Sequence, residues 1–170
     1  MEQEPIETII EVLKEQKIDL VVTLPEEPTY PLTETVRRDP YFTSVTVAAE
    51  GHGLALCAGA SIGGRGTVFV TGVAGLLVGT WALAQMGVLY NIPLFILASY
   101  RGDIGDRSGI SGAQLQMFQQ VGEPMLNALR IPYRVVDQRG TLKRKLEDGY
   151  FACRDYSTPL VLLLSGEVLW

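Results

Sequence analysis

The sequence predicts an α/β fold in three layers, with a mostly parallel sheet flanked by helices. Short segments rich in β-branched and apolar residues alternate with helix-length segments along the whole chain. The strand-like segments are apolar at nearly every position, as strands are when helices cover both faces of a sheet. The length of 170 residues, 47% of them hydrophobic, suits a single domain spanning residues 1–170.

Hydrophobic spacing defines the expected elements of the N-terminal part. Apolar residues at helical spacing behind a proline predict a helix over residues 5–16, and an apolar run predicts a strand over 19–24. Three prolines predict a loop over 25–31, followed by a short helix over 32–38. The β-branched run 43–49 predicts a second strand, and the run 50–62, rich in Ala, Leu and Gly, predicts a helix.

The middle of the chain is uncharged between Arg65 and Arg101. Glycines, Asn91 and Pro93 divide it into an expected strand over 67–71, a helix over 74–90 and a strand over 93–99. This is typical of a β-α-β unit buried on both faces. A membrane hairpin is the alternative, although a span needs about 20 apolar residues without such breaks.

The C-terminal part predicts a glycine-rich charged loop over residues 100–112 and a helix over 114–129, interrupted at 122–124 by glycine and proline. A strand over 133–136, a helix over 142–154 and an apolar strand over 159–165 follow. Parallel sheets bind ligands beyond the carboxyl ends of their strands. Candidate site residues are therefore expected in segments 25–31, 50–53, 72–75 and 100–112.

Composition and cysteine use exclude several classes of protein. The net charge of −5 argues against a nucleic-acid partner. The acidic N-terminus is unlike a secretory signal. Cys57 and Cys153 lie far apart without a CxxC motif, so we expect two buried thiols in a reducing compartment. A cytoplasmic protein without a membrane partner is expected.

Three glycine-containing segments are similar to known binding or catalytic motifs, but none of them matches its motif fully. Leu56 stands where a dinucleotide fingerprint beginning at Gly51 needs its third glycine, and Arg65 stands where a P-loop needs lysine. Residues 109–113 miss the G-x-S-x-G elbow by one position. The spacing of His and Cys fits no zinc site, so no metal ligand is predicted in this chain.

Glu50 is the strongest single candidate, because it stands between an apolar strand and a helix of small residues. A carboxylate at a helix N-terminus can simply satisfy free N–H groups and the helix dipole. Gly51 and Gly53, however, allow either the backbone or a ligand to approach closely. An apolar setting would then suit proton exchange between the carboxyl group and a ligand nitrogen.

Residues 48–60 (AAEGHGLALCAGA) resemble the glutamate segment of the pyrimidine-binding (PYR) domain of thiamine diphosphate enzymes. Three further stretches extend the resemblance to the sulfopyruvate decarboxylase alpha subunits and the related N-terminal half of phosphonopyruvate decarboxylase. They are residues 19–25 (DLVVTLP), the pair 90–94 (YNIPL) and 100–102 (YRG), and residues 124–133 (PMLNALRIPY). Together they cover nearly the whole chain, and their order and spacing are more specific than any one motif.

The resemblance implies a thiamine diphosphate-dependent 2-oxo acid decarboxylase, a carboxy-lyase that converts 3-sulfopyruvate to sulfoacetaldehyde and CO₂. In such enzymes the glutamate hydrogen-bonds N1′ of the cofactor's aminopyrimidine, which makes Glu50 the expected activator of the cofactor. His52, beside it, is expected to assist proton transfer.

The remaining expected site residues follow strands. The resemblance places three of them against the cofactor: Gly72, Gly75 and Leu76. It places Pro25 in the substrate loop. Arg101 is expected at the substrate because it directly follows a strand and its planar guanidinium suits a sulfonate, phosphonate or carboxylate. Other candidate cations for an anionic substrate are Arg37, Arg38 and Arg107.

The chain lacks the GDG…N stretch that holds the diphosphate and Mg²⁺ in such enzymes, since residues 147–149 (EDG) have the wrong flanks. The resemblance therefore implies a beta-type partner subunit that carries this stretch and holds the Mg²⁺. Thiamine diphosphate would bind between the two chains of a hetero-oligomer with homodimer-like PYR contacts, and this chain would be active only with its partner.

One departure from the family leaves alternatives open. The related decarboxylases carry Asn-Ser-Gly-Leu-Gly-Asn where residues 73–78 of this chain read VAGLLV. The loss of both asparagines leaves open which 2-oxo acid is used and whether the chain is active. The alternatives are a PYR-type subunit of a carboligase or 2-oxo acid synthase, and a non-catalytic regulatory subunit.

Overall fold

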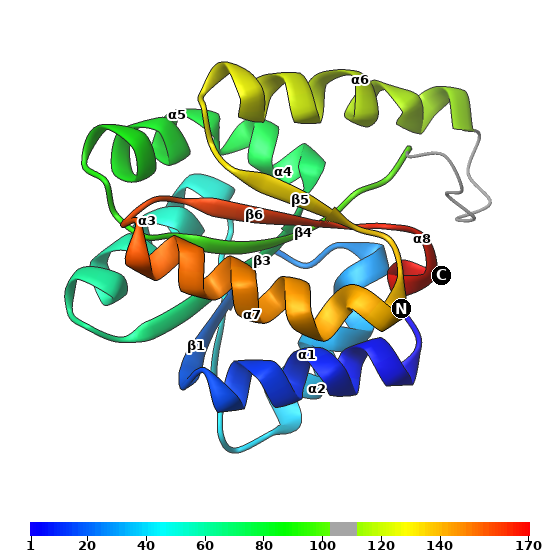
Figure 1. Cartoon of the computed structure of the whole chain (residues 1–170), viewed down its shortest axis with the longest axis horizontal. Coiled ribbons are helices and arrows are strands. Elements are labelled where there is room, and N and C mark those ends of the chain that lie inside the picture. Colours follow the sequence, from blue (N-terminus) through cyan, green and yellow to red (C-terminus); the bar gives the residue numbers. More distant parts are fainter. Residues whose placement is uncertain (103–111) are drawn as a thin grey trace.

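Six parallel strands form one sheet between two layers of helices (Figure 1). This computed structural model describes residues 1–102 and 112–170. The strand order is β2-β1-β3-β4-β6-β5, and every pairing among the described strands is parallel. The strands are β1 (Ile18–Thr23), β2 (Thr43–Thr46), β3 (Gly66–Gly72), β4 (Phe95–Ser99), β5 (Tyr133–Val136) and β6 (Leu160–Leu164). The expected three-layer α/β class is confirmed.

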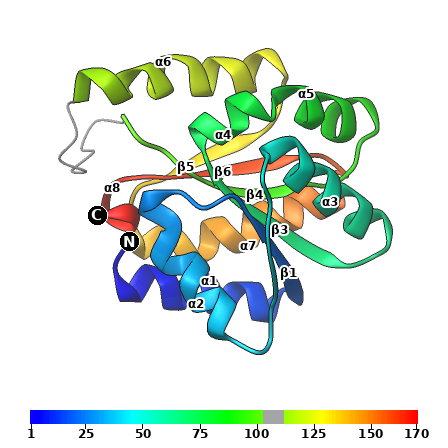
Figure 2. The same cartoon turned by 180° about the vertical axis from the view of Figure 1, so that it is seen from behind.

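The helices cover both faces of the sheet (Figures 1 and 2). One layer consists of α1 (Gln3–Glu15), α2 (Tyr30–Arg38) and α7 (Arg139–Asp155). The other consists of α3 (Glu50–Ile62), α4 (Val73–Val78), α5 (Thr80–Ala82), the π-helical segment η2 (Leu83–Leu89) and α6 (Gly112–Ala128). The short α8 (Gly166–Leu169), which the sequence analysis did not anticipate, follows β6.

The continuously apolar strands supply a separate core to each layer. Val68 and Val70 of β3 belong to the core beneath α1, α2 and α7, whereas Phe69 between them belongs to the core beneath α3 to α6. A side chain at Gly53 would overlap the Phe69 ring, so this glycine lets α3 lie close to β3. Burial on both faces explains why these strands show no alternation of polar and apolar residues.

Several expected boundaries differ from the structure. The strand expected over 43–49 ends at Thr46, and the helix expected over 142–154 begins at Arg139. The segment 25–31 is not only a loop: a 3₁₀ turn, η1 (Glu27–Thr29), leads into α2, because proline is accepted in the first turn of a helix. The single helix expected over 74–90 is divided at Gly79, where α4 ends. Thr80 Oγ1 then donates to the Leu76 and Leu77 carbonyls.

The interruption expected at 122–124 was also wrong, because α6 passes through Pro124. Tertiary contacts on the two preceding residues hold this part of the helix in place. Gly122 packs against Val73, and Glu123 accepts hydrogen bonds from the Tyr100 and Tyr133 hydroxyls at 2.5 and 2.8 Å. These contacts compensate for the backbone hydrogen bond that proline cannot make.

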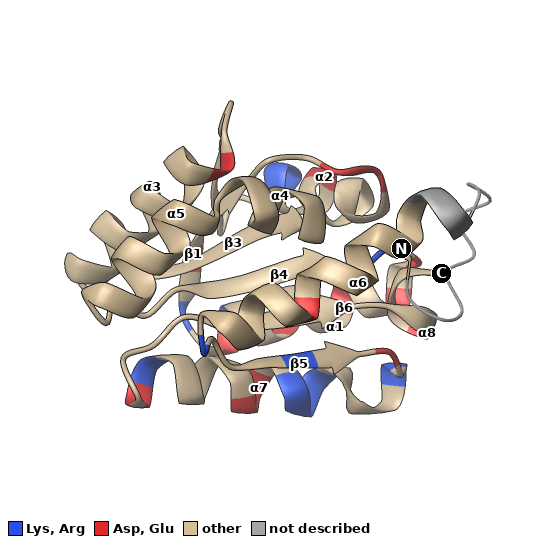
Figure 3. Ribbon diagram, turned by 90° about the horizontal axis from the view of Figure 1, so that it is seen from above, with Lys and Arg blue, Asp and Glu red and all other residues tan. Residues whose placement is uncertain are grey.

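The uncharged stretch of the sequence forms β3, α4, α5, η2 and β4. Helices α4 and α5 are accordingly free of charge in Figure 3, while α7 carries both signs. No helix within residues 1–102 and 112–170 is long and apolar enough to cross a membrane. Cys57 and Cys153 are both buried and unpaired, as expected.

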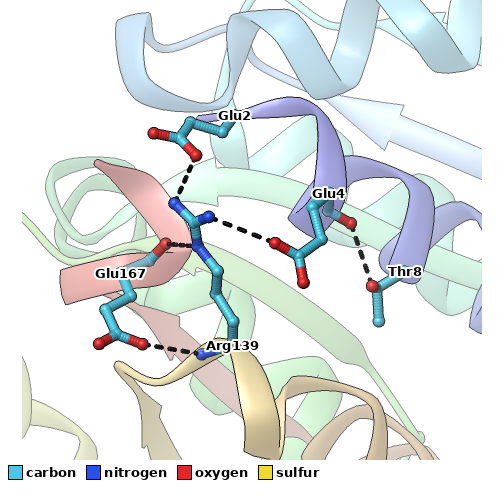
Figure 4. A network of polar contacts seen from close by, with 5 residues as sticks. All are labelled: Glu2, Glu4, Thr8, Arg139 and Glu167. Carbon is cyan, nitrogen blue, oxygen red and sulfur yellow. Dashed lines mark hydrogen bonds and ion pairs between the residues drawn. The ribbon is translucent and has the colours of Figure 1, made fainter.

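Arg139 joins the two ends of the chain (Figure 4). Its guanidinium contacts the Glu2 carboxylate at 2.6 Å and the Glu4 carboxylate at 3.3 Å, both near the N-terminus. Its Nε donates to the Glu167 carbonyl at 2.8 Å, in α8. The start of α7 is thus tied to both termini, which lie next to each other in Figures 1 and 2.

Candidate functional site

The carboxyl ends of all described strands meet at one edge of the sheet, because every pairing is parallel. Thr23 at the end of β1 lies between Thr46 of β2 and Val70 of β3. Gly72 at the end of β3 lies beside Ser99 at the end of β4. The segments that follow these strands carry most of the site residues expected from the sequence, so the edge is the candidate site.

Glu50 opens α3, as expected, and its side chain lies along a glycine face. A Cβ on Gly79 would stand 3.3 Å from the Glu50 Cβ, and a Cβ on Gly75 would stand 2.9 Å from Glu50 Oε1. Gly75 and Gly79 are one helical turn apart and are joined by a backbone hydrogen bond of 2.8 Å. These two glycines therefore make the space that the glutamate side chain occupies.

The Glu50 carboxylate does not cap its own helix. Ala49 is the N-cap residue of α3 and makes no side-chain cap, and no hydrogen bond or ion pair engages the carboxylate within residues 1–102 and 112–170. Glu50 is also only partly buried. The carboxylate is therefore available to a ligand, which a purely capping role would not require.

Glu26 is a second carboxyl group at this edge, and the sequence analysis did not single it out. It precedes η1, and its carboxyl group lies so close to Gly72 that any side chain at that position would overlap it. The Ser99 hydroxyl donates a hydrogen bond to its Oε2. Glu26 thus connects the ends of β1, β3 and β4.

The electrostatic surroundings of Glu26 favour its neutral form. Burial raises the pKa of Glu26 from 4.5 to about 7. Of its charged neighbours, the Arg101 guanidinium opposes this rise in pKa, and Glu27 and Glu50 add to it. The site therefore combines a carboxyl group that holds its proton near neutral pH with the open carboxylate of Glu50, an arrangement suited to proton exchange.

Arg101 follows β4 directly and is only 9% exposed. Its Nη1 lies 3.3 Å from Oε2 of the exposed Glu27. Its Nε and Nη2 are buried and have no hydrogen-bond partner in the part of the chain that the structure describes. Gly102, with φ +78°, then turns the backbone beneath Leu115, where no other residue would fit.

The other expected site residues lie at varied depths. His52 is exposed on the first turn of α3, and Pro25 is exposed immediately before Glu26. Leu76 is 1% exposed within the core beneath α3 to α6. Gly72, the last residue of β3, and Gly75, in the first turn of α4, are buried.

Of the expected cations, only Arg101 is placed at the site by the described residues. Arg37 and Arg38 lie on α2 with exposed side chains, and both are paired with Glu34. Arg107 lies outside the described residues. The structure therefore brings together Glu50, Gly72, Gly75 and Arg101.

Two residues of this site were missed, Glu26 and Ser99. Adjacent acidic residues directly after a buried strand were the available signal for Glu26, since a carboxylate there needs a partner or a proton. A polar final residue in the otherwise apolar β4 was the signal for Ser99. Among the described residues no group of three His, Cys, Asp or Glu side chains could hold a metal ion.

Comparisons with known proteins point to one family, although no family model matches the chain. It is 31% identical to the sulfopyruvate decarboxylase subunit alpha of Methanothermobacter thermautotrophicus over 134 residues, 79% of each chain. It is 27% identical to the protein of the same name from Methanococcus maripaludis, over 94% of this chain and 93% of that one. The sulfopyruvate decarboxylase of Methanosarcina acetivorans is 35% identical over 96% of this chain, which corresponds to 41% of that protein.

A solved structure shares the fold. The thiamine diphosphate-dependent 4-hydroxybenzoylformate decarboxylase of Rhodococcus jostii matches 97% of this chain with a TM-score of 0.71 and 16% sequence identity. The match covers 30% of that longer protein. The chain therefore has the fold of one part of a larger decarboxylase.

Proposed function

Because this chain belongs to the family of sulfopyruvate decarboxylase alpha subunits, we propose that it is the alpha subunit of a thiamine diphosphate-dependent carboxy-lyase. Its substrate is 3-sulfopyruvate, which loses CO₂ to give sulfoacetaldehyde. The observation that carries the proposal is the free Glu50 carboxylate, seated on the glycine face of α4 at the carboxyl edge of the sheet. We assign residues 1–170 to a single PYR domain, and the unpaired thiols agree with a cytoplasmic enzyme.

The residues of the edge fit the aminopyrimidine end of the cofactor. A side chain at Gly72 would overlap Glu26, and one at Gly75 would overlap Thr71 and Glu50. The two glycines therefore leave room for both glutamate side chains at this edge. When bound, thiamine diphosphate supplies the nucleophilic carbon and the electron sink for decarboxylation. Glu50 would share a proton with N1′ of the pyrimidine, and Gly72 and Gly75 would border the bound ring. Leu76, which is 1% exposed, would support this part of the site from the core.

The substrate lies over the ends of β1 and β4 in this proposal. Pro25 precedes Glu26 at the end of β1, and Arg101 follows β4 with unpartnered guanidinium nitrogens suited to an anion. His52, exposed on the first turn of α3, is accessible for proton transfer to substrate or to a partner chain. These roles use side chains that already stand at one edge of the sheet.

A beta-type partner subunit completes the site. The Methanosarcina relative is a single protein of which this chain matches 41%, so a relative of this chain is continuous with a further segment. The sequence lacks the GDG…N stretch, and we assign that stretch, the diphosphate and Mg²⁺ to the partner subunit. The cofactor then lies between the two chains of a hetero-oligomer.

The test is reconstitution with the partner subunit that carries the GDG…N stretch. The complex should release CO₂ and sulfoacetaldehyde from 3-sulfopyruvate, and a panel of 2-oxo acids should define its range. Formation of a ketol would instead indicate a carboligase or synthase, and the absence of any turnover would favour a regulatory subunit. Residues 73–78 (VAGLLV) make this comparison necessary, because Val73 and Leu76 place buried apolar side chains in that stretch.

Glu50→Gln separates the role of the carboxylate from that of the fold. The amide has the same shape but cannot accept the proton, so the complex should assemble and lose turnover. Glu7→Gln, on the exposed face of α1, is the matched control and should remain active. Near-normal turnover of Glu50→Gln would remove Glu50 from its proposed role, and tight Mg²⁺-dependent binding of the cofactor by the isolated chain would contradict the shared site.

A further inference from the structure

Arg101 presents an unpartnered pair of donors inside the protein. The residue is only 9% exposed. Its Nε and Nη2 are buried, and neither has a hydrogen-bond partner in the described part of the chain. Buried guanidinium donors normally have acceptors, because leaving them without one costs free energy. This edge of the guanidinium therefore points to a ligand.

In two other arginines of this protein, Nε and Nη2 donate together to the two oxygens of one carboxylate. Arg65 donates from Nε and Nη2 to the two carboxylate oxygens of Asp19 at 3.0 and 2.9 Å. Arg37 does the same to Glu34 at 3.0 and 2.8 Å. The free edge of Arg101 thus suits an oxyanion that can offer two oxygens side by side.

Glu27 does not satisfy this edge. Its carboxylate is 3.3 Å from Nη1, on the other side of the guanidinium, and its side chain is 71% exposed. Glu26 interacts electrostatically with Arg101 and accepts its hydrogen bond from Ser99. Glu27 therefore holds the guanidinium in place and leaves the Nε–Nη2 edge to a ligand.

A 3-sulfopyruvate molecule carries two anions, and the chemistry distinguishes them. The carboxylate loses its charge as CO₂ departs, so a strong ion pair with it would stabilise the substrate more than the transition state and slow the reaction. The sulfonate keeps its charge throughout. An ion pair with the sulfonate therefore contributes binding without opposing the loss of CO₂.

We propose that the Nε–Nη2 edge of Arg101 binds the sulfonate of the substrate and leaves the departing carboxylate to other groups. This inference rests on the proposed decarboxylation and makes Arg101 the residue that selects a 2-oxo acid with a second, terminal oxyanion. Glu27 is a positioning residue for Arg101.

The kinetic test compares 3-sulfopyruvate with pyruvate, which has no terminal anion, in the assembled complex. Arg101→Gln should raise KM for 3-sulfopyruvate about 10- to 100-fold, the range expected for lost charge-assisted hydrogen bonds. Arg101→Lys keeps the positive charge but loses the paired Nε and Nη2 donors. Its KM for 3-sulfopyruvate should lie between those of the wild type and Arg101→Gln. Pyruvate, measured as a substrate or as a competitive inhibitor, should be unaffected, and this also shows that the variants fold. Equal losses with both compounds would overturn the proposal.

Arg144→Gln is the matched control, because it removes one positive charge from an 87% exposed side chain on α7. This variant should change neither the KM for 3-sulfopyruvate nor the constant measured for pyruvate. If it raises KM for 3-sulfopyruvate as much as Arg101→Gln does, net charge is responsible and the specific site is refuted.

A binding measurement on the full chain stands apart from the reaction. Methanesulfonate should shift the arginine Nε–H resonance of Arg101 in a ¹⁵N-arginine spectrum, and the shift should be absent in Arg101→Lys. The absence of a response to methanesulfonate overturns the inference, whereas an inactive complex with a methanesulfonate response refutes only the proposed function.

Discussion

Replacing Glu26 with glutamine should change how the stability of the chain depends on pH. Burial raises the pKa of this carboxyl from 4.5 to about 7, so the folded chain binds its proton more tightly than the unfolded chain does. The stabilising contribution of the protonated carboxyl is therefore fully present below pH 4.5 and is lost as pH rises to about 7. Glutamine, which is neutral at every pH, does not undergo this loss.

The magnitude follows from the same values. A tenfold change in proton affinity is worth about 1.4 kcal/mol, so the wild type should lose about 2–3 kcal/mol relative to Glu26→Gln between pH 5 and pH 8. Urea denaturation of both proteins at pH 5, 6, 7 and 8 gives the free energy of unfolding at each pH. The difference between variant and wild type should grow in favour of the variant up to about pH 7 and then level off.

The comparison cancels all other titrating groups, because both proteins share them. Glu7→Gln is the matched control, since the Glu7 side chain is exposed and accepts a hydrogen bond from Gln3 within its own helix. Its difference from the wild type should stay constant with pH. A constant difference for Glu26→Gln as well would refute the assignment of Glu26 as a carboxyl group that is protonated near neutral pH.

Three further predictions concern the packing around the site. The alanine side chain in Gly75→Ala would overlap Thr71 and displace the Glu50 side chain. The assembled complex should therefore lose most of its turnover, while circular dichroism shows a folded chain. Normal turnover would mean that Gly75 is not needed to position Glu50. Gly53→Ala would push α3 away from the Phe69 ring and should destabilise the chain by about 1–3 kcal/mol in urea denaturation, whereas Gly59→Ala, on the open side of the same helix, should be neutral or stabilising. Arg139→Ala should lower the free energy of unfolding, and the effect should shrink in high salt. An unchanged effect in 1 M salt would argue for lost packing instead.

The fold class was predictable because each strand is apolar enough to be buried on both faces. The boundaries 50–62 and 133–136 were predicted as the structure has them, since glycine or proline stands beside them. The course of the chain through Pro124 was not predictable, because it depends on the hydroxyl groups of Tyr100, which follows β4, and Tyr133 of β5, which reach Glu123. Local signals for helix ends describe one segment, whereas tertiary contacts can override them.

The site was predictable where its residues follow strands, as Glu50 and Arg101 do. Glu26 was missed because a glutamate in a proline-rich segment is ordinarily a surface residue. Its position against Gly72 and Ser99 depends on the strand order, which places β3 between β1 and β4. Sequence spacing alone does not show that order.

The network around Arg139 has a consequence for chain connectivity. Arg139 contacts both Glu2, near one terminus, and Glu167, near the other. A short linker should therefore join the two ends without disturbing α1 or α8. A circularly permuted chain, opened at the Gly63–Gly64 turn between α3 and β3, would keep every strand pairing and every residue of the site. The order of segments along the chain is thus separable from the arrangement that forms the edge of the sheet.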